Sequence, residues 1–471
     1  MKSLVLEWVQ QVRGVFLRFV KKVSESLESG LNYQEFQSEL SRELDALGRE
    51  ALRLVIEACD ERLLEEPEAR PGWVVARRGD RKRLLTVFGY VDYERTYFKH
   101  KASGRHEYLA DRHVGVVPHQ RIDVGLKGAL VERAAERSYR KSGRWHEGDE
   151  ARHVSGQTVM KAVHNAPIVP MTTRSSREKR KVEYLFIEAD EDHVGNRSGA
   201  RWQPRLVTVH EGREGPAWRR RLVNKRQFGG LYLQRTEELW HEVWRYLDET
   251  YELEEVAAIL VSGDGAGWIR AGCEYIPGSV FVLDRYHAGK YVTQAAGGNQ
   301  GLYGRMRRAL ASADRRELSD ALEEAEREAQ TASRREAIDE ARRYFKRNWD
   351  GIAAWGTFRG VWPGCSAEGQ VSHLYAARMS SRPMAWGRKG VEQMSRLRVM
   401  QANGVSIRQA YVREHTRGLP PLRLSARRLQ VMRQALNDQS VLGGILFENV
   451  PALGGSSYTL RRALKSIIYG L

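Results

Sequence analysis

The stretch LFIEADEDHVGNRSG, residues 185–199, joins an apolar run to a dense group of acids. The apolar run predicts a buried β-strand, and the acids begin where that strand ends. Glu188, Asp190, Glu191 and Asp192 repel one another, so folding alone gives little reason to collect them at this point. A positively charged partner is therefore expected at the end of this strand.

The segments that follow predict an α/β fold. Apolar runs indicate further strands, and amphipathic spacing indicates helices between them. The strands are expected in residues 204–212, 219–234 (at a sheet edge), 255–265 and 278–287, and the helices in 236–251 and 266–276. Residues 288–354 are rich in Ala, Glu and Arg and are predicted to be wholly helical, with solvated charged faces.

Shifts in composition divide the chain into eight regions. The tail is basic, and the linker is polar and lacks large apolar residues over 172–181. The expected regions are an N-terminal helical region (1–75), a small β-hairpin region turning near Gly89 on two short strands (76–115), a helix-turn-helix-like DNA-binding region (116–170), a linker (171–182), the first part of the core (183–287), a helical insertion (288–360), the final helix of the core (361–420) and a C-terminal tail (421–471).

The helix-turn-helix-like outline depends on residues 116–170. A helix, a short helical turn and a second helix capped by Ser155 would give it, with Val159, Val163 and His164 near one face. Helical pairs that bind nothing share this outline, so both interpretations remain open.

The charge of the chain favours a polyanionic partner. There are 77 Lys and Arg against 60 Asp and Glu, a formal net charge of +17. Nucleic acid is the first expectation and an anionic membrane surface the second. A basic protein without such a partner would have the same composition.

The cysteines and the N-terminus fit a cytoplasmic protein. The 3 cysteines are far apart and form no CxxC pair, which fits a reducing compartment and argues against structural zinc. Charged residues interrupt the apolar N-terminal run, so we expect an amphipathic helix rather than a signal peptide or membrane anchor.

Three acids fall at comparable places in the predicted topology. Asp190 ends the first strand, Asp264 ends the strand in 255–265, and Glu368 lies early in a late helix. Because strand ends gather ligand-facing groups in α/β sheets, these carboxylates can converge. Carboxylates without His or Cys partners suit Mg²⁺, with Mn²⁺ substituting, and two such ions can promote phosphodiester displacement.

Each acid also has a simpler interpretation. Asp264 between two glycines could begin a turn, and Glu368 could be an N-terminal helix acid favoured by the helix dipole. The acids of residues 188–192 could form an exposed loop. The three positions together favour the metal site.

Four motifs carry a family resemblance. FIEADEDHV, GDGAGWI, LDRYHAGKYV and GCSAEGQVSHLYAARMSSRPMAWG resemble the ISLre-type transposases of bacterial insertion sequences, formerly an uncharacterised protein family and distantly similar to Mutator-like DDE transposases. The likeness extends more loosely over nearly the whole chain. It implies an RNase H-like catalytic core interrupted by an all-α insertion.

The resemblance implies roles for particular residues. Asp190, Asp264 and Glu368 would be the catalytic triad and the ligands of two Mg²⁺ ions, with Asp192 as the alternate first acid. Asp284 and His287 resemble the family's D-x-F-H stretch, with Tyr286 in place of Phe. Downstream of Glu368, Arg378 and Arg382 could hold phosphates. Trp349 or Trp355 could stack on a displaced base, although a packed core position is the stronger expectation for both.

The function that follows is that of a DDE transposase. It would bind the terminal inverted repeats of an insertion sequence, cleave a phosphodiester and join the exposed 3′-OH to target DNA, as a homodimer that pairs two ends. The alternatives are an RNase H-like metal nuclease without strand transfer, and a DNA-binding protein without catalysis.

Overall fold

The computed structural model describes residues 3–145, 152–170, 178–196, 198–382, 384–422 and 430 of the 471-residue chain. The chain divides into two compact units. Unit 1 comprises Met1–Leu130, Gly143–Ser155 and Tyr411–Leu471, and unit 2 comprises Val131–Ser142 and Gly156–Ala410. Most of the predicted tail (421–471) and most of the predicted linker (171–182) lie outside the described residues.

Unit 1 begins with two long helices, α1 (Ser3–Glu28) and α2 (Tyr33–Glu65), which pack together. A capping box fixes the start of α2. The side-chain oxygen of Asn32 accepts hydrogen bonds from the backbone N–H groups of Gln34 and Glu35 at 3.0 and 3.1 Å, and the Glu35 carboxylate accepts one from the Asn32 N–H at 3.0 Å. These bonds satisfy N–H groups that have no partner within the helix.

A β-hairpin packs against α2. Strands β1 (Trp73–Thr86) and β2 (Gly89–His100) pair antiparallel and turn next to Gly89 as predicted, and β3 (His106–Glu107) adds a third strand. Leu84, Val91 and Tyr93 of the hairpin form a buried cluster with Ile56 of α2. The prediction of short strands was wrong, because β1 and β2 have 14 and 12 residues.

The region predicted to be helix-turn-helix-like contains short helices. They are α4 (Val124–Glu136), α5 (Tyr139–Gly143) and α6 (Gly156–His164), and α3 (Leu109–His113) precedes this region. Helix α6 follows Ser155, and Val159 and Val163, which were predicted to lie near one helical face, are both buried. The connection from α5 to α6 exceeds the three or four residues of a helix-turn-helix turn. DNA binding by this region stays a prediction.

A five-stranded mixed sheet organises unit 2, in the order β10-β7-β4-β11-β12. Central β4 pairs antiparallel with β7 and parallel with β11. The strands are β4 (Tyr184–Glu191), β7 (Arg205–His210), β10 (Arg226–Gly230), β11 (Ala258–Gly263) and β12 (Ser279–Leu283). All five predicted strands are present, and β10 takes the predicted edge position.

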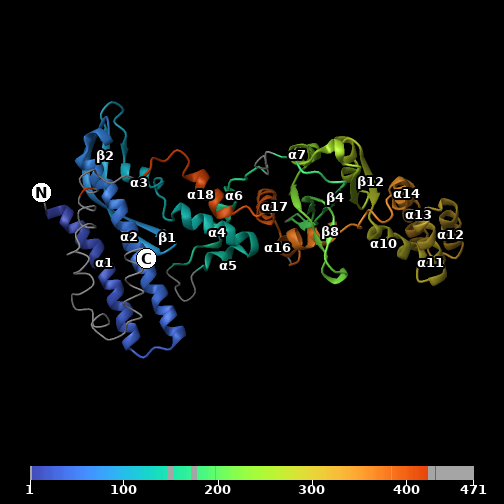
Figure 1. Ribbon diagram of the computed structural model, residues 1–471, viewed down its shortest axis with the longest axis horizontal. Coiled ribbons are helices and arrows are strands. Elements are labelled where there is room, and N and C mark those ends of the chain that lie inside the picture. The colour runs from blue at the N-terminus through green and yellow to red at the C-terminus, as the bar shows by residue number, and fades with distance from the viewer. Residues whose placement is uncertain are drawn as a thin grey trace. The chain divides into compact units, whose positions relative to one another are not determined.

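Unit 2 also contains short two-stranded sheets, and 3₁₀ turns occur in both units. One pair is β5 (Val194–Gly195) with β6 (Arg201–Trp202), and another is β8 (Arg213–Glu214) with β9 (Arg221–Leu222). The 3₁₀ turns are η1 (Pro67–Ala69) in unit 1, and η3 (Ala217–Arg219) and η4 (Leu253–Glu255) in unit 2. In Figure 1, the β8 hairpin projects from the sheet.

Helices pack on the sheet, and a run of further helices follows β12 in the chain. In α7, Leu239, Val243 and Leu247 are fully buried, as the predicted amphipathic pattern requires. The helices before and after β12 are α7 (Thr236–Thr250), α8 (Gly267–Arg270), α9 (Gly272–Tyr275), α10 (Arg285–Ala296), α11 (Gln300–Ala311), α12 (Arg315–Arg327), α13 (Ala332–Arg347) and α14 (Trp349–Thr357). Figure 1 shows α10–α14 gathered beyond β12, which matches the predicted wholly helical stretch.

The chain then returns to the sheet. Helix α15 (Ala367–Val371) packs against β4 and β7, and a π-helical turn, η5 (Ser372–Ala376), follows it. The remaining helices are α16 (Ala377–Met379), α17 (Arg388–Ala402) and α18 (Ile407–His415). Among the helices described, none combines the length and the apolar character needed to cross a bilayer.

Candidate active site

The first candidate acid lies at the end of the central strand. Asp190 is buried in β4, and its Oδ1 accepts a hydrogen bond from the Glu191 N–H at 2.9 Å. Neighbouring Glu191 accepts a hydrogen bond from the indole Nε1 of Trp268 at 2.5 Å. The acids of residues 188–192 therefore have different environments and do not form one exposed loop.

The second candidate acid follows β11 in a turn that requires both flanking glycines. The Asp264 Oδ1 accepts from the Ala266 N–H at 2.8 Å, and its carbonyl accepts from the Tyr344 hydroxyl at 2.7 Å. A Cβ at Gly263 would lie 2.7 Å from the Ala189 carbonyl oxygen of β4. Gly265 has φ +89°, and a Cβ there would meet Asn348 at 2.4 Å. The turn interpretation of GDG is thus correct, and the turn lies against the strand that carries Asp190.

The third candidate acid, Glu368, lies next to a histidine that follows β12. Asp284 caps α10, accepting from the Tyr286 N–H at 3.1 Å and pairing with the Nδ1 of His287 at 2.8 Å. The Nε2 of the same imidazole lies 3.9 Å from the Glu368 carboxylate, whose side chain is 60% exposed at the start of α15. His287 thus bridges Asp284 and Glu368.

The pKa values of this group indicate that the acids lie in one electrostatic environment. Burial, together with the charges of Asp264 and Glu368, raises the pKa of Asp190 to about 7, although the backbone hydrogen bond from Glu191 and the charge of His287 oppose this shift. Burial lowers the pKa of His287, but its bond to Asp284 and the charges of Asp284, Asp190 and Asp264 outweigh burial and raise it. The neighbouring acids thus favour protonation of the His287 imidazole, and a protonated imidazole would offset part of their repulsion.

The alternate first acid has a different set of partners. Asp192 is buried, accepts hydrogen bonds from the Ser380 hydroxyl on both carboxylate oxygens at 2.9 Å, and accepts one from the His193 N–H at 2.8 Å. Burial is the largest cause that raises its pKa, and Glu368 is the charged acid that adds to it. The Asp192 carboxylate is thus already bonded, whereas Asp190 is influenced by both of the other candidate acids.

Sequence reasoning missed a buried network beneath these acids. Glu188 is 1% exposed and accepts hydrogen bonds from Arg213 Nη2 at 2.8 Å and from the Ser366 hydroxyl at 2.5 Å. The Nε2 of His210 lies 3.3 Å away. Burial raises the pKa of Glu188, but its bonds to His210 and Ser366 and the charge of Arg213 outweigh burial and lower it. Through Ser366, this network ties the start of α15 to β4.

The supporting arginines differ in accessibility. Arg378 is buried, and its Nε donates to the Ala134 carbonyl at 2.9 Å while its guanidinium faces the rings of Tyr139 and Trp386. Arg382 is exposed. Phosphate binding stays a prediction for both, and only Arg382 is open to solvent.

The two tryptophans of the helical insertion are both packed. Trp355 is buried and donates to the Leu283 carbonyl at 2.7 Å, and Trp349 packs on the core. Packed core positions were the stronger expectation for both.

The chemistry of the acids fits a hard divalent cation. Carboxylate oxygens are the ligands that Mg²⁺ prefers, and the pKa of Asp190 is raised by burial first and then by the charges of Asp264 and Glu368, which a cation would offset. Within the part of the chain that the structure describes, however, no three His, Cys, Asp or Glu side chains are already arranged as a metal site. The exposed Glu368 side chain is the member whose rearrangement would tighten the group.

Comparison with known proteins identifies the family. The UPF0236 family, described as an uncharacterised protein family, matches residues 26–416. The chain belongs to the UPF0236 family. The match contains the hairpin of unit 1, the whole mixed sheet and all the candidate acids.

Relatives within UPF0236 match most of their own length. A UPF0236 protein of Caldanaerobacter subterraneus subsp. tengcongensis is 39% identical over 395 residues, covering 84% of this chain and 83% of that protein, and its name joins eleven numbered designations. A second from that organism is 38% identical over 397 residues, 83% of this chain and 84% of the other. A Streptococcus gallolyticus protein, named as UPF0236 in the vanSb 3′ region, is 25% identical over 403 residues, 83% of this chain and 87% of its own.

Proposed function

We propose that this UPF0236 protein is a DDE transposase with an RNase H-like core, which binds the ends of an insertion sequence and cleaves and joins DNA there. The observation that carries the proposal is the electrostatic linkage of Asp190, Asp264 and Glu368, three acids from separate elements around one histidine. The sheet supports the fold, because a central first strand with antiparallel neighbours on one side and parallel ones on the other suits an RNase H-like core.

The proposed roles follow from the surroundings of each acid. Asp190, Asp264 and Glu368 would hold Mg²⁺, which supplies Lewis acidity at the phosphate and compensates the acids' charge. Asp284 orients the His287 imidazole, which keeps a positive charge beside the acids. The Glu188 network holds the start of α15, and with it Glu368, near β4.

The relatives and the charge of the chain are consistent with this proposal. A relative whose name joins eleven designations is what a mobile element present in many copies would leave in one genome. The net charge of +17 suits a protein that holds DNA around an acidic pocket. A homodimer pairing two DNA ends, and a cytoplasmic protein associated with the nucleoid, belong to the same proposal.

Nicking of DNA tests the proposal directly. Purified protein is incubated with Mg²⁺ and DNA that carries its own gene with both flanks. Asp264→Asn should reduce nicking by roughly 100-fold or more with DNA binding retained, because a charged contact to the reacting groups is lost. Asp320→Asn, an exposed acid on α12, is the matched control and should nick normally. Equal nicking by both variants would remove Asp264 from the mechanism.

One observation favours a second candidate, a DNA-binding protein without catalysis. The described acids are not closed into a three-ligand metal site. Calorimetric titration with Mn²⁺ separates the two, because the non-catalytic protein shows no heat that depends on Asp190. A third candidate, a nuclease that does not join strands, would cut DNA but fail with pre-cleaved ends in a strand-transfer assay.

A further inference from the structure

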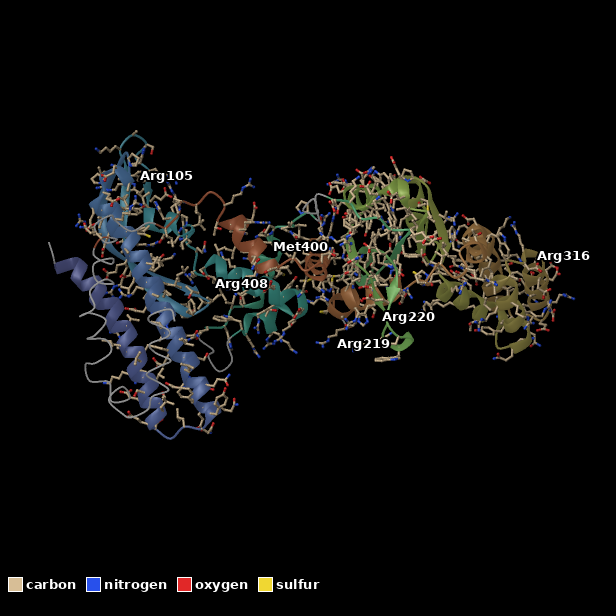
Figure 2. The ribbon with its side chains drawn as sticks, viewed as in Figure 1. Arg105, Arg219, Arg220, Arg316, Met400 and Arg408 are labelled. Atoms are coloured by element: carbon tan, nitrogen blue, oxygen red, sulfur yellow. The ribbon has the colours of Figure 1, made fainter. Side chains whose placement is uncertain are left out.

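The β8–β9 hairpin, residues 213–222, carries an exposed aromatic ring beside three consecutive arginines. Trp218 is 81% exposed, the highest value among the exposed large apolar side chains described. Arg219, Arg220 and Arg221 follow it and are all exposed. Figure 2 labels Arg219 and Arg220 on this hairpin, away from the five-stranded sheet. The ring and the arginines together give this hairpin an apolar face and positive charge that a partner could contact.

Local geometry gives the hairpin a defined shape. Strands β8 and β9 pair through Arg213 with Leu222 and Glu214 with Arg221. The Arg219 N–H donates to the Pro216 carbonyl at 2.8 Å and closes the turn. Gly215 has φ +93°, and a Cβ there would lie 2.9 Å from the Arg219 carbonyl oxygen. Only glycine fits that position, so the ring and the arginines project from a shaped turn.

The base of the hairpin is anchored beside the candidate acids. Arg213 Nη2 donates to Glu188 of β4 at 2.8 Å and to the Gly364 carbonyl at 3.1 Å, shortly before α15. These two contacts join the hairpin to the elements that carry Asp190 and Glu368. The tip, by contrast, is unpaired: within the described chain, Trp218 makes no ring contact and the three arginines make no ion pair.

We propose that the 213–222 hairpin is a DNA-contacting element, in which Trp218 stacks on an unpaired base next to the cleavage site and Arg219–Arg221 bind the flanking phosphates. Charge complementarity favours DNA as the partner, because residues 213–222 contain four arginines and one glutamate. Aromatic rings stack on bases, and guanidinium groups form bidentate hydrogen bonds with phosphates. The inference rests on the proposed function and adds to it a contact outside the acidic pocket.

The experiment uses full-length protein in the Asp264→Asn background, which stays bound without cutting. Duplexes that carry 2-aminopurine at successive positions around the cut report unstacking, and fluorescence anisotropy reports affinity. Trp218→Ala should abolish the 2-aminopurine change and weaken binding by roughly 5- to 150-fold, the range for one stacked base. Trp218→Tyr should restore most of both. Tyr33→Ala, which removes a ring that is 75% exposed in unit 1, is the aromatic control and should change neither.

The arginines need a control for net charge. Arg219→Ala, Arg220→Ala and Arg221→Ala are combined and compared with combined Arg316→Ala, Arg327→Ala and Arg335→Ala, which removes three exposed arginines of the helical insertion. The hairpin triple should weaken binding more and should lower the salt dependence of binding, because it loses phosphate contacts. Equal losses in the two triples would overturn the assignment of the hairpin.

The outcomes separate this inference from the proposed function. If Trp218→Ala nicks DNA normally with Asp264 intact and leaves the 2-aminopurine signal unchanged in the Asp264→Asn background, the hairpin contact is overturned and the transposase proposal stands. If the 2-aminopurine signal depends on Trp218 but the protein with Asp264 intact never nicks DNA, the hairpin contact stands and the transposase proposal is overturned. If Trp218→Ala instead loses binding to phosphatidylserine vesicles and keeps DNA affinity, the hairpin is a membrane contact and the inference is wrong.

Discussion

At the scale of single residues, Asp190 and Asp192 differ in the partners of their carboxylates. Both are buried, two positions apart, so the side-chain period of a strand cannot separate them. Ser380 occupies both oxygens of Asp192, whereas Asp264 and Glu368 both raise the pKa of Asp190. This difference favours Asp190 as the first acid of the site.

Isosteric variants test that choice. Asp190→Asn should reduce Mg²⁺-dependent nicking by roughly 100-fold or more, because it removes a charged group next to the reacting atoms. Asp192→Asn should cost less than about tenfold, since an amide can still bond the Ser380 hydroxyl. Initial rates at saturating DNA measure both. An inactive Asp192→Asn beside an active Asp190→Asn would exchange their roles.

Glu188 is predicted to matter for stability. Glu188→Gln removes the charge that compensates Arg213, so the unfolding free energy should fall by about 2 kcal/mol or more. The urea midpoint, followed by tryptophan fluorescence at neutral pH, measures the change. Glu237→Gln, an exposed acid in the first turn of α7, should leave the midpoint unaltered. Equal midpoints for the two variants would show that the Glu188 network contributes little.

Sequence could identify some site residues and not others for a physical reason. Asp190 and Asp264 each follow an apolar run, and that local pattern marks a strand end. Glu188 lies in the same stretch, but its role depends on His210, Arg213 and Ser366, which only the fold brings close. Trp218 was not predicted as a site residue, because the arginines that follow it were assigned to an edge strand over residues 219–234. In the structure, the start of this stretch belongs to a projecting turn.

At the scale of elements, the hairpin and α2 of unit 1 are joined by a buried carboxylate. Asp60 of α2 accepts hydrogen bonds from the Thr96 N–H at 3.0 Å and from the Thr96 hydroxyl at 2.6 Å. Burial raises the pKa of Asp60 above its ordinary value, although these bonds and the charge of Arg95 oppose the shift. The folded state therefore holds this proton more tightly than the unfolded chain does.

The raised pKa gives a signed prediction for stability. Asp60 contributes its full stability below the unfolded pKa of about 3.9, and that contribution is lost as pH rises through the raised folded value. Asp60→Asn should remove this decline, as measured by hydrogen exchange of the Thr96 amide in variant and wild type between acid and neutral pH. Asp92→Asn is the control with the opposite sign, because the bond to Arg83 lowers the pKa of Asp92. A decline that survives in Asp60→Asn would contradict the assignment.

At this scale, the strands marked by a hydrophobic pattern could be predicted from the sequence. The lengths of β1 and β2, which are held together by charged cross-strand pairs, could not. Most strands of the mixed sheet contain a short apolar run, so the number of strands could be predicted from the sequence. The middle of β1 carries exposed Arg77–Arg83, where register shifts occur and cross-strand pairs such as Arg83 with Asp92 at 2.7 Å hold the hairpin. Such pairs depend on register, which a single sequence does not reveal, so these strands were predicted too short.

At the scale of the whole molecule, a group of acids coexists with an excess of positive charge. Burial and the charges of Asp264 and Glu368 raise the pKa of Asp190, while the chain carries a net charge of +17. A polyanion approaching this protein is attracted by the overall charge and repelled near these acids unless cations offset their charge. DNA binding and metal binding are thus expected to support each other.

This coupling predicts how DNA affinity responds to salt and to divalent ions. The logarithm of the affinity for duplex DNA should fall linearly with the logarithm of salt concentration, at about −0.9 per phosphate neutralised. Adding Ca²⁺, an oxygen-liganded divalent ion, should raise affinity in the wild type at constant ionic strength. Asp190→Asn should reduce that increase, because a ligand and a repulsive charge are both lost. Anisotropy titrations with labelled duplex at several salt concentrations measure both effects. A flat salt response would contradict the electrostatic basis for DNA binding. An equal effect of Ca²⁺ on the DNA affinity of wild type and Asp190→Asn would show that the Asp190 carboxylate does not couple metal binding to DNA binding.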